Sequence, residues 1–271
     1  MANENIQKQR QSSDILDPDH MANWPIRCLG GMDITIATRD QTASGFIDFV
    51  KNKHKRGERP FYSTSSNGQV MAMCDDDNGL ASEFAKADQI SPDGMPMVFA
   101  SKILPGASLP ERVATTDLFH DVAKLAEKNN VSFYLLGADE NANKATFDKV
   151  RQQYPNLNIA GRRNGYFSQD EEQEIVAQIN DCKPDILWVS MGVPREQFFI
   201  SRNIDALTNV SVIKTSGGLF DFLSLRRSRA PRWMQFIGLE WVYRSILEPR
   251  RLGLRYVLTN PKALKLLLTN S

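Results

Sequence analysis

The chain has 271 residues, of which 41% are apolar and 24% are charged, so it is long enough for one large globular domain or a domain with an appendage. Its 3 cysteines and 3 histidines are scattered, which excludes a disulfide-rich scaffold and disfavours a structural zinc site. No run approaches the roughly 18 consecutive apolar residues of a membrane-spanning helix, and the polar N-terminus lacks the apolar core of a secretory signal.

The net charge of +1 conceals an uneven distribution. From residue 222 to 271, ten Lys or Arg stand against two Glu, so this segment carries +8 and the rest of the chain sums to −7. A basic end on an acidic body favours a polyanionic partner, either nucleic acid or anionic lipid.

Short apolar runs bounded by turn-forming residues predict strands, and longer polar segments between them predict helices. Residues 1–25 are polar and are expected to form a disordered tail. A helix is expected over 45–54, another runs from Gly137 to about Tyr154, and Ser168 caps a third with an acidic start. The predicted strands are, in chain order, 32–37, 61–64, 87–90, 131–136, 158–160, 185–190 and 210–215.

Strands that alternate with helices predict an α/β fold with a mostly parallel, Rossmann-like sheet, which we assign to residues 26–225. Gly137, Gly192 and the pair Gly217 and Gly218 follow three of these strands. Ligands of such sheets bind outside the carboxyl ends of the strands, so the three glycine turns together favour a nucleotide crevice. Glycine is also common in ordinary strand-to-helix turns. Neither GxGxxG nor GxxxxGK[ST] is present, which argues against a dehydrogenase and a P-loop protein.

From residue 229 onward the strand pattern stops. The sequence predicts two or three short helices separated by Pro231, Pro249 and Pro261, in which aromatic and aliphatic residues alternate with arginines. This composition is typical of a segment at a membrane interface, and its aromatic residues favour lipid over nucleic acid. A solvated basic helix face is the plainer alternative. We therefore expect residues 226–271 to form a basic, amphipathic, membrane-associating appendage.

Three charged residues stand where the chain leaves a predicted strand or enters a helix. Asp93 lies in a Pro-Asp-Gly turn, where it is either a turn former or a general base at the mouth of the sheet. Asp117 suits the first turn of a helix, and Arg112 can simply pair with it.

Six motifs, taken together and in order, resemble those of the WecG/TagA/CpsF family, the family 26 glycosyltransferases. The resemblance covers residues from about 32 to 261. The motifs are SPDG at 91–94, ERVATTDLF at 111–119, NGYF at 164–167, GVPREQ at 192–197, GGLFDF at 217–222, and RAPRWM at 229–234 continuing through EW at 240–241 to EPRR at 248–251.

The resemblance implies an inverting, metal-independent glycosyltransferase without a cofactor, with a Rossmann-like core and a helical appendage that completes the active site. It would move a hexose-type sugar, such as N-acetylmannosamine, its uronic acid or glucose, from a UDP-sugar to a sugar carried on polyprenyl diphosphate. The product would serve bacterial exopolysaccharide, antigen or wall-polymer synthesis. The resemblance further implies a cytoplasmic protein, peripheral on the inner face of the membrane, and leaves a homo-oligomer open.

The resemblance also suggests roles for single residues. Asp93 matches the proposed base, and Ser65 and Asn67 match a Thr-x-Asn motif near the catalytic pocket. Arg244 and Arg251 match appendage arginines that hold the diphosphate. Tyr166 matches a residue that packs on uracil. The expected nucleotide-binding residues are Gly137, Tyr166, Gly192, Glu196, Gln197, Gly217, Gly218 and Asp221. Arg112 and Asp117 are expected to be acceptor-binding or structural residues.

Two positions depart from the family pattern. Glu196 and Gln197 reverse the usual Gln-Glu order, and Thr115 stands where glycine is usual. A carboxylate cannot donate a hydrogen bond as an amide does, so either the two side chains exchange roles or the contact with uracil is weaker. Glu196 therefore supports one alternative, a non-catalytic nucleotide-binding regulator of polysaccharide assembly.

Overall fold

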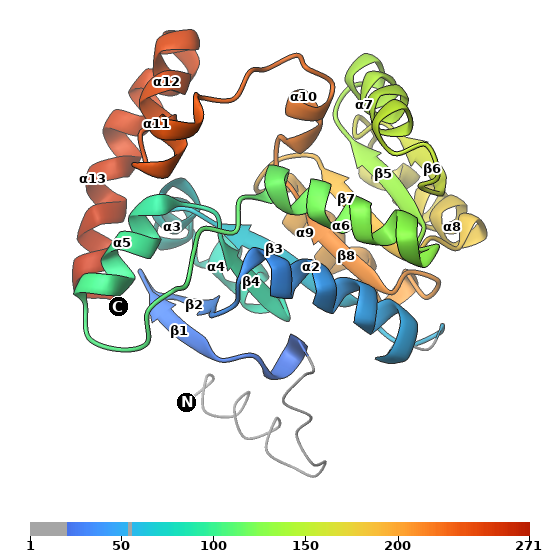
Figure 1. The fold of residues 1–271 in the computed structure, drawn as a ribbon, viewed down its shortest axis with the longest axis horizontal. Coiled ribbons are helices and arrows are strands. Elements are labelled where there is room, and N and C mark those ends of the chain that lie inside the picture. Colours follow the sequence, from blue (N-terminus) through green and yellow to red (C-terminus); the bar gives the residue numbers. More distant parts are fainter. Residues whose placement is uncertain (1–20, 54–55) are drawn as a thin grey trace.

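The computed structural model describes residues 21–53 and 56–271, except for the side chains of Ala22, Lys53, Arg251 and Leu254. Its central feature is a six-stranded sheet in the order β4-β3-β8-β7-β5-β6 (Figure 1), in which every pairing is parallel. The predicted α/β class is therefore confirmed. The strands are β3 (Phe61–Ser66), β4 (Gln89–Pro92), β5 (Phe133–Gly137), β6 (Ile159–Arg163), β7 (Ile186–Ser190) and β8 (Val212–Thr215).

The predicted strands of this sheet are confirmed with small shifts at their ends. The strand expected at 32–37 is β2 (Met32–Thr35), but it lies outside the parallel sheet and pairs antiparallel with β1 (Ile26–Leu29). β1 was not predicted, because Arg27 interrupts its apolar pattern. The guanidinium of Arg27 is buried and donates to four backbone carbonyls, those of Ser101, Leu104, Pro105 and Ala107.

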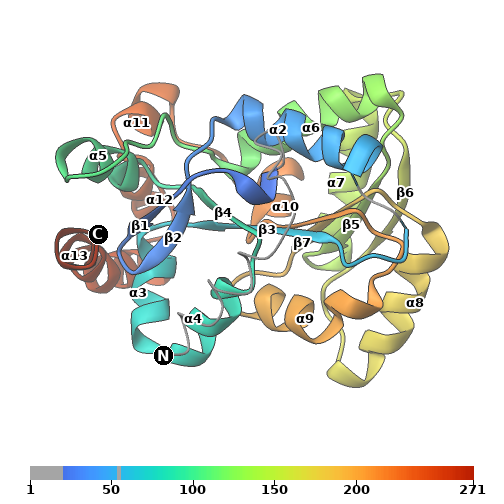
Figure 2. The same cartoon turned by 90° about the horizontal axis from the view of Figure 1, so that it is seen from below.

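Helices cover both faces of the sheet, as Figure 2 shows. One face carries α2 (Arg39–Asp48), α6 (Thr115–Asn129), α7 (Glu140–Gln153) and α10 (Leu219–Leu223), and the other carries α3 (Gly68–Asp76), α4 (Asn78–Ala85), α8 (Glu172–Cys182) and α9 (Arg195–Asn203). Alternate side chains of β7 point into the two cores. Trp188 joins the cluster under α6, whereas Leu187 and Val189 join the cluster under α8 and α9. Such burial on both sides explains the continuous apolar runs in the sequence.

The helix expected at 45–54 begins six residues early. The hydroxyl of Thr38 accepts from the amide of Gln41, and the Gln41 side chain accepts from the Thr38 amide, which forms a complete capping box at the start of α2. The helix predicted after Gly137 ends at Gln153, and Ser168 caps the acidic segment before α8 as expected.

The C-terminal segment is helical, as predicted, and lies beside the β4 edge of the sheet (Figure 1). It comprises α11 (Arg232–Phe236), α12 (Glu240–Leu247), a π-helical turn (Pro249–Gly253) and α13 (Leu254–Thr269). The prediction that Pro261 separates two helices is wrong, because α13 continues through it. Packing of Leu266 and Leu267 in the core with residues of α3 offsets the hydrogen bond that proline cannot donate.

The C-terminal residues contact the turn of the hairpin formed by β1 and β2. The amide of Gly31 donates to the carbonyl of Asn270 at 2.9 Å, and the amide of Gly30 donates to the hydroxyl of Ser271 at 3.0 Å. The predicted tail lies outside the described residues up to residue 20, and Met21 is already buried in the core. The domain boundaries at 25 and 225 stay a prediction.

Candidate active site

A cleft of about 670 Å³ opens at the carboxyl ends of the strands. One side, the core wall, is formed by Ser65, Asn67, Asp93, Arg112 and Thr115. The opposite side, the C-terminal wall, is formed by Arg226, Arg227, Glu240, Arg244 and Arg255. The parallel sheet therefore presents its pocket at the edge that the glycine turns predicted.

Most of the predicted site residues line this cleft. They are Ser65, Asn67, Asp93, Arg112, Tyr166, Gly192, Glu196, Gly217, Gly218, Asp221 and Arg244. Gly137, Asp117 and Gln197 are not part of the lining. The side chain of Arg251 lies outside the described residues. Gly137 has a structural role, because its φ is 138° and an added Cβ would lie 2.2 Å from the carbonyl oxygen of Ser190.

Asp93 follows β4 directly and presents a carboxylate that is held from both sides. Its Oδ1 accepts from Nε and Nη2 of Arg112 at 3.3 and 3.2 Å. Its Oδ2 accepts from the amide and the hydroxyl of Thr115 at 3.2 and 3.0 Å. Donors on both oxygens fix the orientation of the group.

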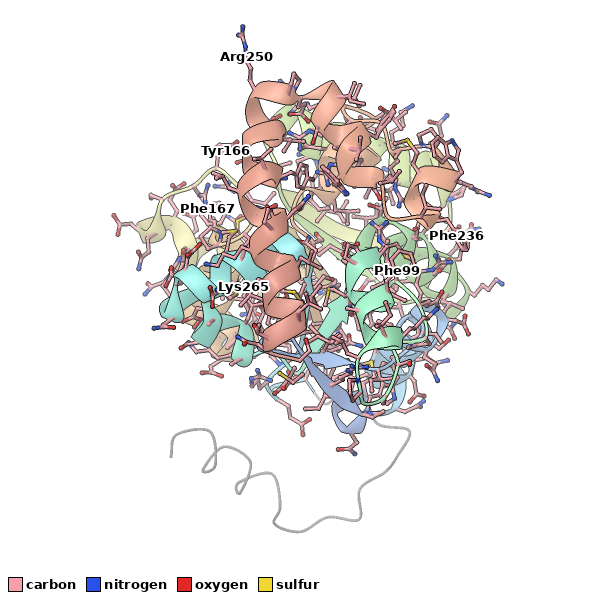
Figure 3. The ribbon with its side chains drawn as sticks, turned by 90° about the vertical axis from the view of Figure 1, so that its left-hand side faces the viewer. Phe99, Tyr166, Phe167, Phe236, Arg250 and Lys265 are labelled. Carbon is pink, nitrogen blue, oxygen red and sulfur yellow. The ribbon has the colours of Figure 1, made fainter. Side chains whose placement is uncertain are left out.

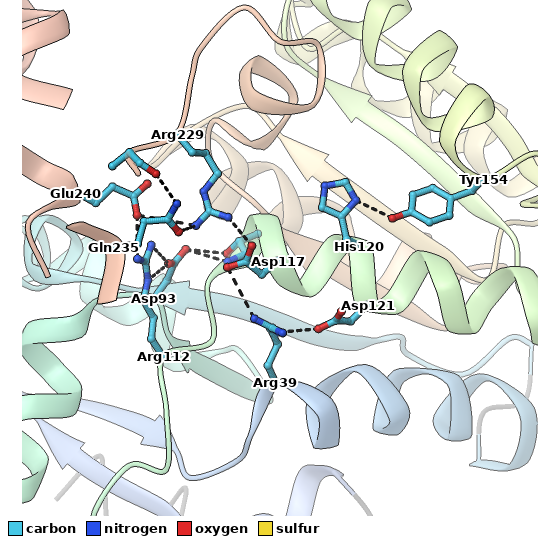
Figure 4. A network of polar contacts seen from close by, with 12 residues as sticks. Arg39, Asp93, Arg112, Asp117, His120, Asp121, Tyr154, Arg229, Gln235 and Glu240 are labelled. Carbon is cyan, nitrogen blue, oxygen red and sulfur yellow. Dashed lines mark hydrogen bonds and ion pairs between the residues drawn. The ribbon is translucent and has the colours of Figure 1, made fainter. Parts of the chain in front are cut away.

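Arg112 joins the two walls of the cleft. Its Nη1 donates to Glu240 Oε2 at 2.8 Å, while its other nitrogens hold Asp93 (Figure 4). Burial lowers the pKa of Arg112, but the carboxylates of Asp93 and Glu240 outweigh burial and raise that pKa above its ordinary value. The suggested pairing of Arg112 with Asp117 is wrong. Asp117 lies in the first turn of α6, as expected, and pairs instead with Arg229 and Arg39.

Beneath the core wall, hydroxyl groups lead from Asp93 to a buried lysine that the sequence analysis did not single out. Thr115 Oγ1 lies 3.1 Å from Ser65 Oγ, which accepts from Lys214 Nζ at 2.7 Å. Lys214 is fully buried, and burial lowers its pKa to about 7. The sequence did contain a sign of this site, because Lys214 lies within 210–215, a run predicted to be a buried strand.

Glu196 ties together two loops that form the base of the cleft. Its carboxylate accepts from the amides of Met191, Gly192 and Gly217 at 3.0 to 3.2 Å. Burial raises the pKa of Glu196 to about 7, although these amides act in the opposite direction. Gln197 lies behind it, with Nε2 3.5 Å from Thr64 Oγ1. Glu196 therefore has a structural task that an acceptor-only side chain performs well.

The far end of the cleft is aromatic and basic. Tyr166 is 73% exposed at its rim, and the guanidinium of Arg195 lies 5.9 Å from the centre of its ring. Asp221 pairs with Arg227 at 2.8 Å, and Arg226 pairs with Asp139. Arg244 was predicted, whereas Arg226 and Arg227 were not, because they lie in the basic segment outside any motif.

The described residues offer neither a metal-binding cluster nor a membrane-spanning helix. Within residues 21–53 and 56–271, no group of three or more His, Cys, Asp or Glu could hold a metal ion. Across the same part of the chain, no helix has both the length and the apolar character needed to cross a bilayer.

Comparison with known proteins identifies the family. Residues 28–271 match the glycosyl transferase WecG/TagA/CpsF family. A relative from Bacillus subtilis strain 168 is 31% identical over 209 residues, which cover 77% of this chain and 80% of the relative. A relative from Bacillus spizizenii is 27% identical over 223 residues, which cover 82% of this chain and 84% of the relative. Both are named N-acetylglucosaminyldiphosphoundecaprenol N-acetyl-beta-D-mannosaminyltransferase. The chain therefore belongs to the WecG/TagA/CpsF family of glycosyltransferases, as the motifs predicted.

Proposed function

We propose that this glycosyltransferase moves N-acetylmannosamine, or a closely related hexose, from a UDP-sugar to N-acetylglucosamine carried on polyprenyl diphosphate. The names of the two Bacillus relatives support this donor and this acceptor. The observation that carries the proposal is one cleft with an oriented carboxylate, Asp93, on its core wall and several arginines on its C-terminal wall. A sugar nucleotide and a lipid-linked diphosphate need both kinds of group.

In the proposed inverting reaction, Asp93 removes a proton from the acceptor hydroxyl while that oxygen attacks the anomeric carbon. UDP leaves from the opposite face of the sugar. Asn67 is placed to assist Asp93. Its side-chain carbonyl accepts from the amides of Gln69 and Val70 at the start of α3. Its side-chain nitrogen is then the group that can donate to a substrate hydroxyl beside Asp93.

The leaving diphosphate requires positive charge. Guanidinium groups bind two oxygens at once, and Arg226, Arg227, Arg244 and Arg255 all line the cleft. We assign the diphosphate to this wall, with Arg244 as the principal contact. The role of Arg251 follows from the family resemblance alone. Tyr166 offers an exposed ring on which uracil can stack, and the loops held by Glu196 lie beside it.

A membrane-facing role for the C-terminal helices follows from their exposed apolar side chains. Figure 3 shows Phe99 of α5 (Met95–Ile103) and Phe236 of α11 on the same side of the molecule as α13. Aromatic and aliphatic residues beside lysines and arginines favour binding to an anionic bilayer surface, which is where the acceptor resides. We therefore place the protein at the cytoplasmic face of the membrane. The exposed large apolar residues of α5 and of residues 229–271, here called the apolar face, are Phe99, Ile103, Trp233, Phe236, Ile237, Trp241, Ile246, Leu247, Val257, Leu258, Leu264 and Leu268.

Release of UDP tests the proposal. The purified chain is mixed with a panel of UDP-sugars and a short-chain polyprenyl-diphosphate N-acetylglucosamine, and UDP-N-acetylmannosamine should give the fastest release. Asp93→Asn should lower kcat by about 10²- to 10⁴-fold, the usual contribution of a general base. Asp121→Asn, which changes a carboxylate of α6 paired with Arg39, is the matched control and should transfer normally.

Two results would count against the proposal. Normal transfer by folded Asp93→Asn would remove the base assignment. Tight UDP binding without UDP release, across all donors and with acceptor present, would favour the non-catalytic regulator instead.

A further inference from the structure

Lys214 occupies an unusual place for a lysine. It lies on β8 in the middle of the sheet, where its Cα pairs with Ser63 on β3 and with Trp188 on β7. Its side chain is fully buried on the α6 side of the sheet. Burying an ammonium group costs free energy unless hydrogen bonds or an opposite charge compensate it. Lys214 does not line the cleft, so it has no direct contact with a substrate there.

The hydrogen bonds above Lys214 have only one consistent direction. Asp93 Oδ2 accepts the single hydroxyl proton of Thr115. Thr115 Oγ1 must therefore accept from Ser65 Oγ, which lies 3.1 Å away. The proton of Ser65 is then committed as well, so Ser65 Oγ accepts from Lys214 Nζ. A lysine can donate in both its charged and its neutral form, so this order does not depend on its protonation state.

We propose that Lys214 is a positioning residue for the general base, acting on Asp93 through the hydroxyls of Ser65 and Thr115. The inference rests on the proposed function, in which Asp93 takes the acceptor proton. Lys214 starts a chain of donors that ends on Oδ2, and Arg112 holds Oδ1 from the other side. Together they leave the carboxylate with one orientation toward the cleft.

Loss of Lys214 should remove the buried donor at the start of this series of hydrogen bonds. Ser65 would lose its donor, and its own proton could turn to another acceptor. The Thr115 hydroxyl would no longer be directed at Asp93, so Oδ2 would keep only the bond from the Thr115 amide and the carboxylate could shift its orientation. Small errors in the placement of a catalytic group lower the rate of the chemical step more than they lower substrate binding.

The test is a comparison of kcat with KM in Lys214→Met, which fills the same space with an apolar chain. We expect kcat to fall about 10-fold or more, short of the roughly 10²- to 10⁴-fold loss of the base itself. KM for the UDP-sugar should stay within about 2-fold, because Lys214 does not reach the cleft. Lys262→Met, at a lysine of α13 paired with Asp75 and Asp76, is the matched control and should leave both constants unchanged.

Thr115 supplies an independent arm of the same test. Thr115→Ser keeps the hydroxyl and should lose less kcat than Thr115→Val, which removes the hydroxyl and should lower kcat as Lys214→Met does. The double variant Lys214→Met with Thr115→Val should be little worse than either single variant, because both break one chain. Tm and UDP affinity are measured for each protein, and Lys214→Leu replaces the Met variant if that variant does not fold.

The outcomes separate this inference from the function on which it rests. Normal transfer by Asp93→Asn overturns the base assignment and the positioning role together. An inactive Asp93→Asn beside a folded Lys214→Met with normal kcat overturns the positioning role alone. Multiplicative losses in the double variant also overturn it, since they would mean that Lys214 and Thr115 act separately.

Discussion

The two walls of the cleft are built in different ways. On the core wall, Ser65 and Asp93 sit at strand ends, and their polar atoms are joined to one another and to Lys214 by hydrogen bonds within the fold. On the C-terminal wall, the arginines extend from a loop, from α12 and from α13, and those of the loop are partly exposed, as in the pairs of Arg226 with Asp139 and Arg227 with Asp221. Exposed ion pairs hold side chains weakly, whereas buried networks hold them firmly.

This difference suggests a division of work. In the proposed reaction, the core wall carries the base that must be placed accurately at the reacting atoms, and the C-terminal wall carries the charges that we assign to the flexible diphosphate. Arg112 is the contact between them, because it binds Asp93 on one side and Glu240 of α12 on the other. Docking of the C-terminal helices on a membrane would then act on the base through this one guanidinium.

Among changes to the C-terminal helices, the largest effect should come from removing the principal charge of the C-terminal wall. Arg244→Ala should lower kcat by about 10²- to 10³-fold, as loss of a transition-state donor does elsewhere, because the charge of the departing UDP is left unmatched. Single-turnover UDP release with a water-soluble acceptor measures this. Arg250→Ala is the matched control, since Arg250 projects away from the molecule (Figure 3). Equal activity of the two variants would contradict the proposed role of this wall.

A smaller effect is expected from the apolar face, which should serve binding to lipid and leave the chemistry intact. Phe236 is 77% exposed on α11. Phe236→Ser should weaken binding to anionic phospholipid vesicles about 10-fold, the equivalent of roughly 1.4 kcal/mol for a partly buried aromatic ring. Ile26→Ser on β1 should bind vesicles normally. Co-sedimentation measures binding, and a loss of kcat on a soluble acceptor would show instead that Phe236 belongs to the active site.

The same contrast explains what the sequence could predict. The sheet strands were found because apolar runs buried on both faces have a clear signature. The roles of Arg27 and Lys214 could not be predicted, because their hydrogen-bond partners are distant in sequence. These partners are the carbonyls of 101–107 for Arg27 and Ser65 for Lys214. Asp93 was found through a motif, but its partners Arg112 and Thr115 become visible only when β4 and α6 are brought together.

The prediction for Pro261 was wrong because local propensity was weighed without tertiary packing. A proline inside a helix costs one hydrogen bond, and the contacts of Ala263, Leu266 and Leu267 with the core outweigh that cost. The reversed order of Glu196 and Gln197 was judged from donors that a nucleotide would need. The structure gives Glu196 a different neighbourhood, three backbone amides of the cleft loops.

The smallest effect concerns the stability of the core wall and its dependence on pH. Burial lowers the pKa of Lys214 from 10.5 to about 7, so between these values the unfolded chain binds a proton that the folded chain does not. The free energy of unfolding of the wild type should therefore rise with pH across this window. Lys214→Met lacks this buried titrating group, and its free energy of unfolding at pH 7 should exceed that of the wild type by on the order of 1 kcal/mol.

That gain should shrink as the pH approaches 10. Glu196, whose pKa burial raises from 4.5 to about 7, makes stability fall as the pH rises between those two values. Glu196 has this effect in both the wild type and Lys214→Met. Its pH range ends at about 7, where the range of Lys214 begins. Urea unfolding at pH 7, 8.5 and 10 measures the difference, with Lys262→Met as the control that shows no such trend. A gain that stays constant with pH would mean that the folded protein keeps Lys214 charged, so that the core wall holds a permanent cation beneath its base.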